Sequence, residues 1–256
     1  MAYEFISVSH TEHLAILTLN RPEKRNAIHG PMLKELLQAL RTLSADEQTG
    51  VLLINANGEH FCAGADIAWM QKIASGSYEE NYDDAQLLAD LMYQLYSFPK
   101  ATIGLAHGAT LGGGLGLLSA CDIAIAAKNA SFGFSEVKIG ITPSTISPYV
   151  IAAIGERAAH YYFLTGERFG AEEAYRIGLL HHVTENDALK STGLMIANRI
   201  LENNQQAVMA AKQLIRHVAK EKISEGLAQK TAEHLANLRC SPTAQAGLKK
   251  FLEKRR

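Results

Sequence analysis

The sequence predicts an α/β fold in which a strand–strand–helix unit recurs about three times before the chain becomes largely helical. Two glycine-rich segments, residues 61–67 and 107–116, indicate this pattern, because each lies between an apolar strand-like run and a helix-like run. The third observation is the helical character of the chain beyond Pro148. The 256 residues, 47% of them hydrophobic, can bury a large core, as one domain or as a main domain with a small appendage.

Two strands and a helix are expected at the N-terminal end. Residues 4–9 and 14–20 have the composition of strands, and Arg21-Pro22 ends the second one. Apolar residues alternate only loosely in that second strand, which indicates burial on both faces. Pro31 suits the first turn of a helix, and apolar residues then recur at helical spacing to about Ser44.

The next unit contains the first glycine-rich segment. A strand is expected over residues 51–55, followed by the glycine loop and a helix through Trp69. Between residues 75 and 84 the apolar period fails, so we expect a mobile, exposed loop that could cover a pocket. A helix over about residues 85–97 should stop before Pro99.

The third unit contains the second glycine-rich segment. A strand over residues 101–106 leads to three consecutive glycines and a helix to about Ala120. Strands over residues 122–127 and 131–134 follow, and the second of them ends at Glu136. Further helices are predicted over residues 171–177, 188–200 and 207–219.

Composition and charge indicate an ordinary cytoplasmic protein. The formal net charge of −1 gives no electrostatic reason to expect nucleic acid or anionic lipid as the main partner. The three cysteines form no CxxC motif, so we expect free thiols in a reducing compartment. No signal peptide is expected. Residues 101–127 are long enough to cross a bilayer, but six glycines, His107 and Asp122 favour a buried strand, turn and helix.

The two glycine-rich segments are suited to form an oxyanion hole. Each offers free backbone N–H groups at a helix start, and two such groups can point at one developing negative charge. A hole of this kind serves acyl transfer or enolate formation. Acyl transfer needs a nucleophile, and the sequence contains no GxSxG elbow or local Cys/His signature, although a triad assembled in space stays open.

Glu136 is the best candidate acid/base for enolate chemistry at such a hole. It follows the apolar run Phe132-Gly133-Phe134, and burial there can tune the proton affinity of its carboxyl group. Composition alone leaves open the alternative that Glu136 is an exposed acid at the end of a strand.

Taken together, several motifs resemble the crotonase superfamily, the enoyl-CoA hydratase/isomerase family. They are Ala106-His107-Gly108 through Gly114, Ser119-Ala120-Cys121-Asp122, and Phe132-Gly133-x-x-Glu136 with Gly140 and Pro143. The resemblance covers nearly the whole chain, from Asn20-Arg21-Pro22 with Asn26-Ala27 to residues 251–255. The combination is specific, whereas any one glycine run would be weak evidence.

The resemblance implies a crotonase spiral of strand–strand–helix turns over residues 1–195. It also implies a C-terminal helical region, residues 196–256, that assembles homotrimers, often paired into hexamers. The implied substrate is a CoA thioester whose carbonyl oxygen lies between the N–H groups of Ala65 and Gly113. Beyond the CoA of the substrate we expect no cofactor or metal, since the hole itself polarises the carbonyl group, and no nucleic-acid or membrane partner.

The resemblance also assigns substrate-binding positions. Those expected within one subunit are Lys24, Ala27, Ala63, Asp66, Ile67, Gly112 and Gly116. Phe251 and Lys254 are expected to approach the nucleotide end from a neighbouring subunit. As alternatives, Lys24 and Lys254 are solvated surface charges, and Asp66 only favours the first turn of its helix.

One departure from the family pattern bears on the reaction. Familiar hydratases have two glutamates, and the first of these positions is Gly116 here, which we expect to leave room where the second carboxylate would hold water. Ser144 stands where dienoyl-CoA isomerase and chlorobenzoyl-CoA dehalogenase use an aspartate, which argues against both activities. A single glutamate also serves Δ3,Δ2-enoyl-CoA isomerases. Residues 135–157, however, are similar to bacterial methylglutaconyl-CoA hydratases and their carboxygeranoyl-CoA relatives, so hydration of a branched glutaconyl-type 2-enoyl-CoA is favoured, with isomerisation as the alternative.

Two further features are interpreted as structural. His181-His182 suggests a metal, but the sequence has no HExxH motif and no carboxylate at ligand spacing, so a turn after a helix is favoured. The cations Lys212, Arg216 and Lys220 form one helical stripe, which the near-neutral charge makes a solvated face.

Two non-enzymatic alternatives also follow from the resemblance. Some crotonase relatives bind RNA through a basic helix, and a protein of this fold can be a catalytically silent scaffold. Both hole positions and Glu136 are retained here, which favours an enzyme.

Overall fold

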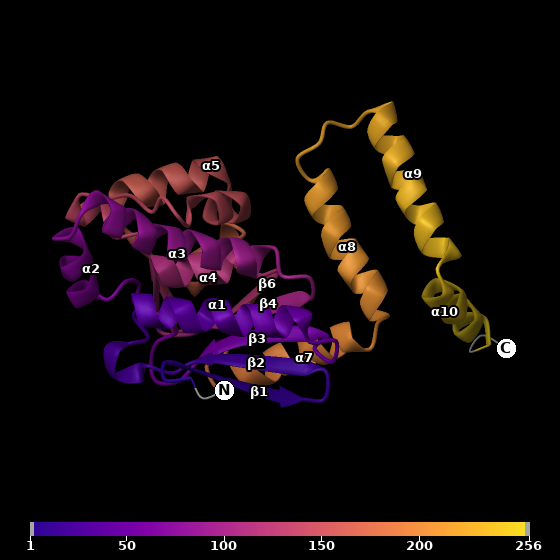
Figure 1. The fold of residues 1–256 in the computed structure, drawn as a ribbon, viewed down its shortest axis with the longest axis horizontal. Coiled ribbons are helices and arrows are strands. Elements are labelled where there is room, and N and C mark those ends of the chain that lie inside the picture. The colour runs from indigo at the N-terminus through magenta and orange to yellow at the C-terminus, as the bar shows by residue number, and fades with distance from the viewer. Residues whose placement is uncertain (1–2, 254–256) are drawn as a thin grey trace.

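The computed structural model describes residues 3–253 and contains two sheets (Figure 1). The main sheet has the strand order β1-β2-β3-β4-β6-β9, and the small sheet has the order β5-β7-β8. The main strands are β1 (Ile6–Thr11), β2 (Leu14–Leu19), β3 (Val51–Ala56), β4 (Ala101–Ala106), β6 (Ile123–Ala127) and β9 (His182–Thr184). The small sheet consists of β5 (Ala109–Leu111), β7 (Ser131–Gly133) and β8 (Arg168–Gly170).

The parallel part of the main sheet places both glycine-rich loops at one edge. β1 and β2 are antiparallel, whereas β2, β3, β4, β6 and β9 run parallel, with Val51 opposite Ala101 and Ile103 opposite Ile123. The carboxyl ends of parallel strands lie at the same edge of a sheet, which is where α/β folds commonly bind ligands. The loops that follow β3 and β4 therefore emerge side by side.

The described part of the chain contains ten α-helices and two 3-10 helices. The first five are α1 (Gly30–Ala45), α2 (Ile67–Ala74), α3 (Tyr78–Tyr96), α4 (Gly113–Ala120) and α5 (Ser147–Thr165). The remainder are α6 (Ala171–Arg176), α7 (Leu189–Leu201), α8 (Gln205–Val218), α9 (Glu225–Cys240) and α10 (Pro242–Glu253). The 3-10 helices are η1 (Pro22–Lys24) and η2 (Glu136–Ile139).

Both faces of the central strands of the main sheet are buried. On β3, Leu52 and Ile54 join the cluster beneath α1, α3 and α4, whereas Val51 and Leu53 join the cluster beneath α7. Successive side chains of a strand point to opposite faces, so a strand covered by helices on both sides is apolar throughout. The same packing applies to β2. It explains why apolar and polar residues alternate only loosely along that strand, as the prediction of burial on both faces required.

The C-terminal helices α8, α9 and α10 stand beside the main body (Figure 1). No residue of α9 is buried, and large apolar side chains such as Leu235, Leu248 and Leu252 are exposed on α9 and α10. Within residues 3–253, no helix has the length and apolar character required to cross a membrane.

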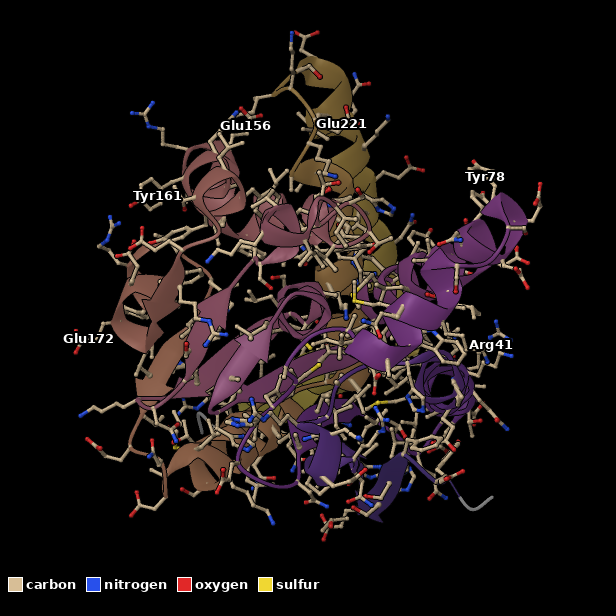
Figure 2. The ribbon with its side chains drawn as sticks, turned by 90° about the vertical axis from the view of Figure 1, so that its left-hand side faces the viewer. Arg41, Tyr78, Glu156, Tyr161, Glu172 and Glu221 are labelled. Carbon is tan, nitrogen blue, oxygen red and sulfur yellow. The ribbon has the colours of Figure 1, made fainter. Side chains whose placement is uncertain are left out.

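The expectation of a mobile loop over residues 75–84 was wrong. Helix α3 begins at Tyr78, because Ser77 forms a capping box in which its hydroxyl accepts the Glu80 N–H and the Glu80 carboxylate accepts the Ser77 N–H. Figure 2 shows Tyr78 at the outer tip of this helix, where it is 78% exposed. The apolar period fails there because this end of α3 extends beyond the core, not because the chain leaves the helical conformation.

The other predicted elements agree with the structure except at their ends. β4 has the predicted bounds, and β1 is displaced by two residues from the predicted 4–9. The three-residue strands β5, β8 and β9 were not predicted, since such short pairings depend on neighbours that are distant in the sequence.

Candidate active site

The first glycine-rich loop leaves one backbone N–H group available to a ligand. Ile28 forms a parallel bridge with Ala65, in which the Ile28 N–H donates to the Gly64 carbonyl over 2.7 Å and the Asp66 N–H donates to the Ile28 carbonyl over 2.8 Å. Because successive N–H groups of an extended segment point to opposite sides, the Ala65 N–H points away from Ile28. It has no acceptor among residues 3–253, and Ala65 is exposed.

The second loop brings the start of a helix to the same place. Gly112 has a φ of 46°, which glycine tolerates, and α4 begins directly after it at Gly113. The Gly116 N–H donates to the Gly112 carbonyl over 3.1 Å, so the Gly113 N–H belongs to the unpaired first turn and has no acceptor in the described chain. A Cβ at Gly112 would lie 3.8 Å from the Gly64 Cα. The loops that carry the two free N–H groups are thus in contact.

Cys62 and Thr110 bridge the two loops. The Cys62 N–H donates to the Ala109 carbonyl over 3.1 Å, and the Leu111 N–H donates to the Cys62 carbonyl over 2.9 Å. Burial raises the pKa of the Cys62 thiol to about 12. Only the thiolate is nucleophilic, so the thiol at this bridge is not suited to acyl transfer.

Glu136 lies against the second loop, as the sequence predicts for an acid/base. It begins η2 just after β7, and a Cβ at Gly112 would lie 2.9 Å from its Oε1 atom. Its Oε2 atom is buried and has no hydrogen-bond partner within residues 3–253. Burial raises the pKa of this carboxyl group above its usual range. The group is therefore half-buried and set for proton transfer, not the exposed strand-end acid of the alternative interpretation.

The expectation that Gly116 leaves open space was wrong. A Cβ at Gly116 would lie 2.3 Å from Cγ2 and 2.9 Å from Cβ of Ile146, and 3.0 Å from the Met92 Sδ. All three residues are buried. Ile146 and Met92 therefore occupy the place where a second acid at position 116 would be. Sequence reasoning missed both residues, because they reach this place from other elements of the fold.

The structure gives Asp66 a structural role. Its carboxylate caps α2 by accepting the Trp69 N–H over 3.0 Å and forms an ion pair with Arg21 over 2.7 Å. These contacts lower the pKa of Asp66, with the hydrogen bond from Trp69 as the largest cause. The contacts support the alternative that Asp66 stabilises the first turn of its helix.

The other predicted substrate-binding residues lie on two adjoining segments. The Ala63 N–H donates to the Arg25 carbonyl over 3.0 Å, which joins the first glycine-rich loop to the segment between η1 and α1. Lys24, the last residue of η1, is exposed; Ala27 is buried; and Ile67, the first residue of α2, is 73% exposed. Lys24 and Ile67 are thus accessible to a ligand.

Two predicted residues cannot be placed. Lys254 lies outside residues 3–253, and Phe251 lies in α10 but its side chain is outside the described part of the structure.

Asn26 links three backbone segments beside the first glycine-rich loop, and reasoning from the residues alone did not single it out. It is fully buried with a φ of 54°, and its side chain accepts the Arg21 N–H over 2.8 Å. Its amide donates to the carbonyls of Asn57 and His60 over 2.9 and 2.8 Å. Asparagine tolerates this left-handed conformation, which was the available sequence signal.

The basic stripe is not a solvated face, contrary to the prediction. Lys212 is only 8% exposed, forms an ion pair with Asp122 over 2.5 Å and donates to the Lys100 carbonyl over 2.8 Å. The Arg216 guanidinium lies 4.7 Å from the centre of the Tyr96 ring. Two of the three cations therefore face the protein.

His181 has a structural role in the turn that precedes β9. Its N–H donates to the Ala124 carbonyl over 2.8 Å, and its Nδ1 atom accepts the Ala124 N–H over 3.2 Å. Among residues 3–253, no group of three or more His, Cys, Asp or Glu side chains could hold a metal ion.

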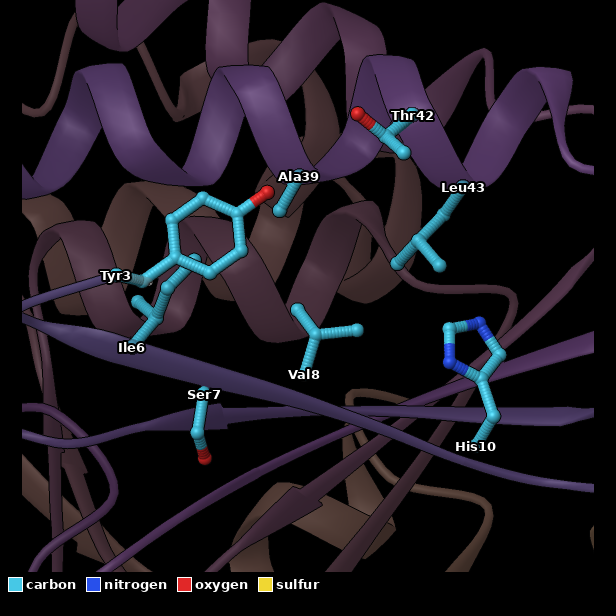
Figure 3. Close-up of a pocket in the computed structure, with 8 residues that line it drawn as sticks. All are labelled: Tyr3, Ile6, Ser7, Val8, His10, Ala39, Thr42 and Leu43. Atoms are coloured by element: carbon cyan, nitrogen blue, oxygen red, sulfur yellow. The ribbon is translucent and has the colours of Figure 1, made fainter. Parts of the chain in front are cut away.

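A pocket of about 380 Å³ between β1 and α1 is separate from both glycine-rich loops (Figure 3). Its walls are Tyr3, Ile6, Ser7, Val8, His10, Ala39, Thr42 and Leu43. None of these residues belongs to either loop, so this pocket does not extend the candidate active site.

Comparison with known proteins gives consistent relatives over the whole chain. The enoyl-CoA hydratase/isomerase family model matches residues 9–256. Crotonyl-CoA hydratase of Syntrophomonas wolfei is 33% identical, covering 100% of this chain and 98% of that protein, and 2,3-dehydroadipyl-CoA hydratase of Escherichia coli is 30% identical, covering 97% and 95%. A crystal structure of an enoyl-CoA hydratase from Shewanella pealeana is 40% identical, with a TM-score of 0.95, and covers 98% of this chain and 94% of that one.

Proposed function

Since the chain belongs to the enoyl-CoA hydratase/isomerase family of the crotonase superfamily, we propose that it is the hydratase of a branched glutaconyl-type 2-enoyl-CoA, such as 3-methylglutaconyl-CoA. The observation that carries the proposal is the pair of unpaired N–H groups, on Ala65 and Gly113, beside the half-buried carboxyl group of Glu136. The similarity of residues 135–157 to methylglutaconyl-CoA hydratases supports the choice of acyl group.

In this mechanism, Ala65 and Gly113 act as the oxyanion hole. Their N–H groups donate to the thioester oxygen, which gains negative charge when the enolate forms. A donor that is already in place and unpaired costs no reorganisation during the reaction. Loss of one such donor typically reduces transition-state stabilisation by about 2.7–4 kcal/mol.

Glu136 carries the proton. As ionised carboxylate it takes a proton from water while the water oxygen bonds to C3, and the C2–C3 π electrons move to the thioester oxygen. The protonated Glu136 then gives that proton to C2, which restores the carbonyl group and yields a 3-hydroxyacyl-CoA. Burial raises the pKa of this group, which brings it closer to neutral pH, where both forms are accessible during turnover.

Isomerisation is the second candidate, and one observation favours it. Ile146 and Met92 fill the space at Gly116, so no second acid holds the attacking water at that position. A single carboxylate suffices to move a proton from C2 to C4 of a 3-enoyl-CoA, or in the reverse direction, with the same hole stabilising the dienolate.

The CoA part of the substrate is proposed to lie along Lys24, Ala27, Ala63, Asp66 and Ile67. The exposure of Lys24 and Ile67 supports this path, whereas the role of Asp66 there is to hold α2. The proposal includes no further cofactor or metal.

We also propose a homotrimer or hexamer in the cytoplasm. The exposed apolar side chains on α9 and α10, and the absence of any buried residue on α9, support assembly through these helices. Cys62, Cys121 and Cys240 are free thiols, which is consistent with a reducing compartment.

The test offers 3-methylglutaconyl-CoA, crotonyl-CoA and a 3-enoyl-CoA to the purified protein and identifies the products by mass. A gain of water on the first substrate supports the proposal. An unchanged mass with new 2-enoyl absorbance on the third would assign the protein as an isomerase instead.

A pair of variants assigns the proton carrier. Glu136→Gln should retain CoA binding and lose about 10²–10⁴-fold in turnover. Glu156→Gln, on the outer surface of α5, is the matched control and should keep full activity (Figure 2). Full activity of Glu136→Gln would contradict the assignment.

A further inference from the structure

A cavity of about 810 Å³ is lined by residues of α8, of the C-terminal ends of α3 and α4, and of the first turn of α5. Figure 1 shows how these helices are arranged. Ser119 lines it from α4, six residues after Gly113, which is about 9 Å along a helix. Between these two points, Gly116 is packed against Ile146 and Met92. None of these three residues lines the cavity, and neither do Ala65 and Gly113.

Among the described residues, the cavity walls carry more positive than negative charge. Arg216 and Lys220 line it from α8, together with Lys212. Asp122 is the one acid among the lining residues found in the described chain, and it is engaged by Lys212 and by the N–H and hydroxyl groups of Thr102. The charges of Arg216 and Lys220 therefore remain available to an anion.

Two polar groups of the walls lack the partners that buried groups normally have. The Nη2 atom of Arg216 is buried and finds no acceptor within residues 3–253, although the guanidinium lies over the Tyr96 ring. The Oγ atom of Ser119 is also buried, and no residue of the described chain forms a hydrogen bond with it. Neither atom is accessible from the cavity in this conformation, so the two atoms add no direct contact to a ligand there.

The rest of the lining is apolar and aromatic. Ile200, Val208 and Ile215 contribute aliphatic surface, and Tyr93, Tyr96 and Tyr149 contribute rings. Burial, with smaller contributions from Tyr93 and Tyr96, raises the pKa of Tyr149, which keeps its hydroxyl group a donor. An apolar lining with a few convergent donors is the usual composition of a small-molecule site.

We propose that this cavity binds a free carboxylate with an apolar body, of the fatty-acid class, at a site separate from the one that holds the thioester. The guanidinium of Arg216 receives the carboxylate, because a planar fork of donors matches its two oxygens. The aliphatic and tyrosine surfaces cover the apolar body.

Titration calorimetry with octanoate tests the proposal, with butyryl-CoA, a saturated thioester that cannot be hydrated, present at saturating concentration. We expect one octanoate per chain and weaker binding of octanol, which lacks the charge. Arg216→Met should weaken octanoate binding at least tenfold. Lys222→Met, which removes an exposed cation outside the cavity, should leave it unchanged.

A second variant tests the proposal independently, in case the Arg216→Met protein does not fold. Ala211 lines the cavity, and Ala211→Phe should narrow it and weaken octanoate binding while every charge is kept. Circular dichroism and thermal unfolding establish that both variants fold.

Four results would overturn the proposal. They are the absence of octanoate binding, equal affinity in the wild type and a folded Arg216→Met variant, competition between octanoate and butyryl-CoA, and loss of octanoate binding as a rising chain concentration drives self-association. Competition would assign Arg216 to the distal end of the reacting acyl group. Loss on self-association would show that a second copy fills the cavity. Both of these outcomes can be interpreted in the same way whether the protein is a hydratase or an isomerase.

Discussion

Replacing Gly116 by alanine tests the packed wall beside the candidate active site. The new methyl group would lie 2.3 Å from the Ile146 Cγ2 atom and 2.9 Å from its Cβ atom, whereas real contacts are well above 3 Å. Ile146 cannot turn away easily, because a β-branched side chain is stiff at χ1 and because it is only 2% exposed.

The two opposing contributions to the free energy of unfolding can be estimated. Overpacking a buried site typically costs about 1–3 kcal/mol, and these short contacts place Gly116→Ala in the upper half of that range. Alanine in a helix interior gains about 1 kcal/mol over glycine. The net expectation is a loss of about 1–2 kcal/mol, which corresponds to a decrease of roughly 2–8 °C in Tm for a chain of this size.

A double-mutant cycle isolates the contact. Ile146→Ala alone should cost about 2–5 kcal/mol, but it removes the Cγ2 atom that Gly116→Ala would meet. In the Ile146→Ala background, Gly116→Ala should therefore cost less than in the wild type, although the 2.9 Å approach to the Cβ atom of residue 146 remains. Urea unfolding of the four proteins at one fixed chain concentration measures this coupling. If Gly116→Ala is at least as stable as the wild type, Ile146 does not close this space and the reasoning fails.

Three further predictions concern other parts of the molecule. Because burial raises the pKa of Glu136 above its unfolded value of 4.5, ionising this group costs stability; Glu136→Gln should be more stable than the wild type at pH 8, and the difference should vanish below pH 4.5, as urea titrations at both pH values would show. An unchanged difference across this range would contradict the assignment. Lys212→Met should lose about 1–3 kcal/mol, because it removes the cation from Asp122, whose side chain is 30% exposed and keeps its hydrogen bonds from Thr102. The exposed Lys222→Met should change the unfolding midpoint little. Truncation after Ala246 should reduce both the sedimentation coefficient of the assembly and the affinity for CoA; wild-type sedimentation would exclude α10 from assembly.

The sequence by itself determined the elements whose signals are local. The apolar run of β4 and the helical spacing of α1 gave bounds that agree with the structure within one residue. The glycines at positions 64 and 112 were also local signals, because they marked the two loops of the candidate active site. Both have positive φ, and their surroundings leave little space for a side chain. The sequence also contained a signal for the start of α3, since Ser77 and Glu80 have the spacing of a capping box. The polar composition of residues 75–84 favoured a loop instead.

Only the tertiary structure decided what surrounds the candidate catalytic group. Ile146 and Met92 belong to elements more than twenty residues away from Gly116, so nothing in the local sequence indicates that they fill its space. The basic stripe of α8 looks solvated on its own helix, yet the fold places Lys212 against Asp122 and Arg216 over Tyr96. The physical reason is that periodicity records which residues share a face of one element, whereas burial, pKa and pairing depend on which other element covers that face.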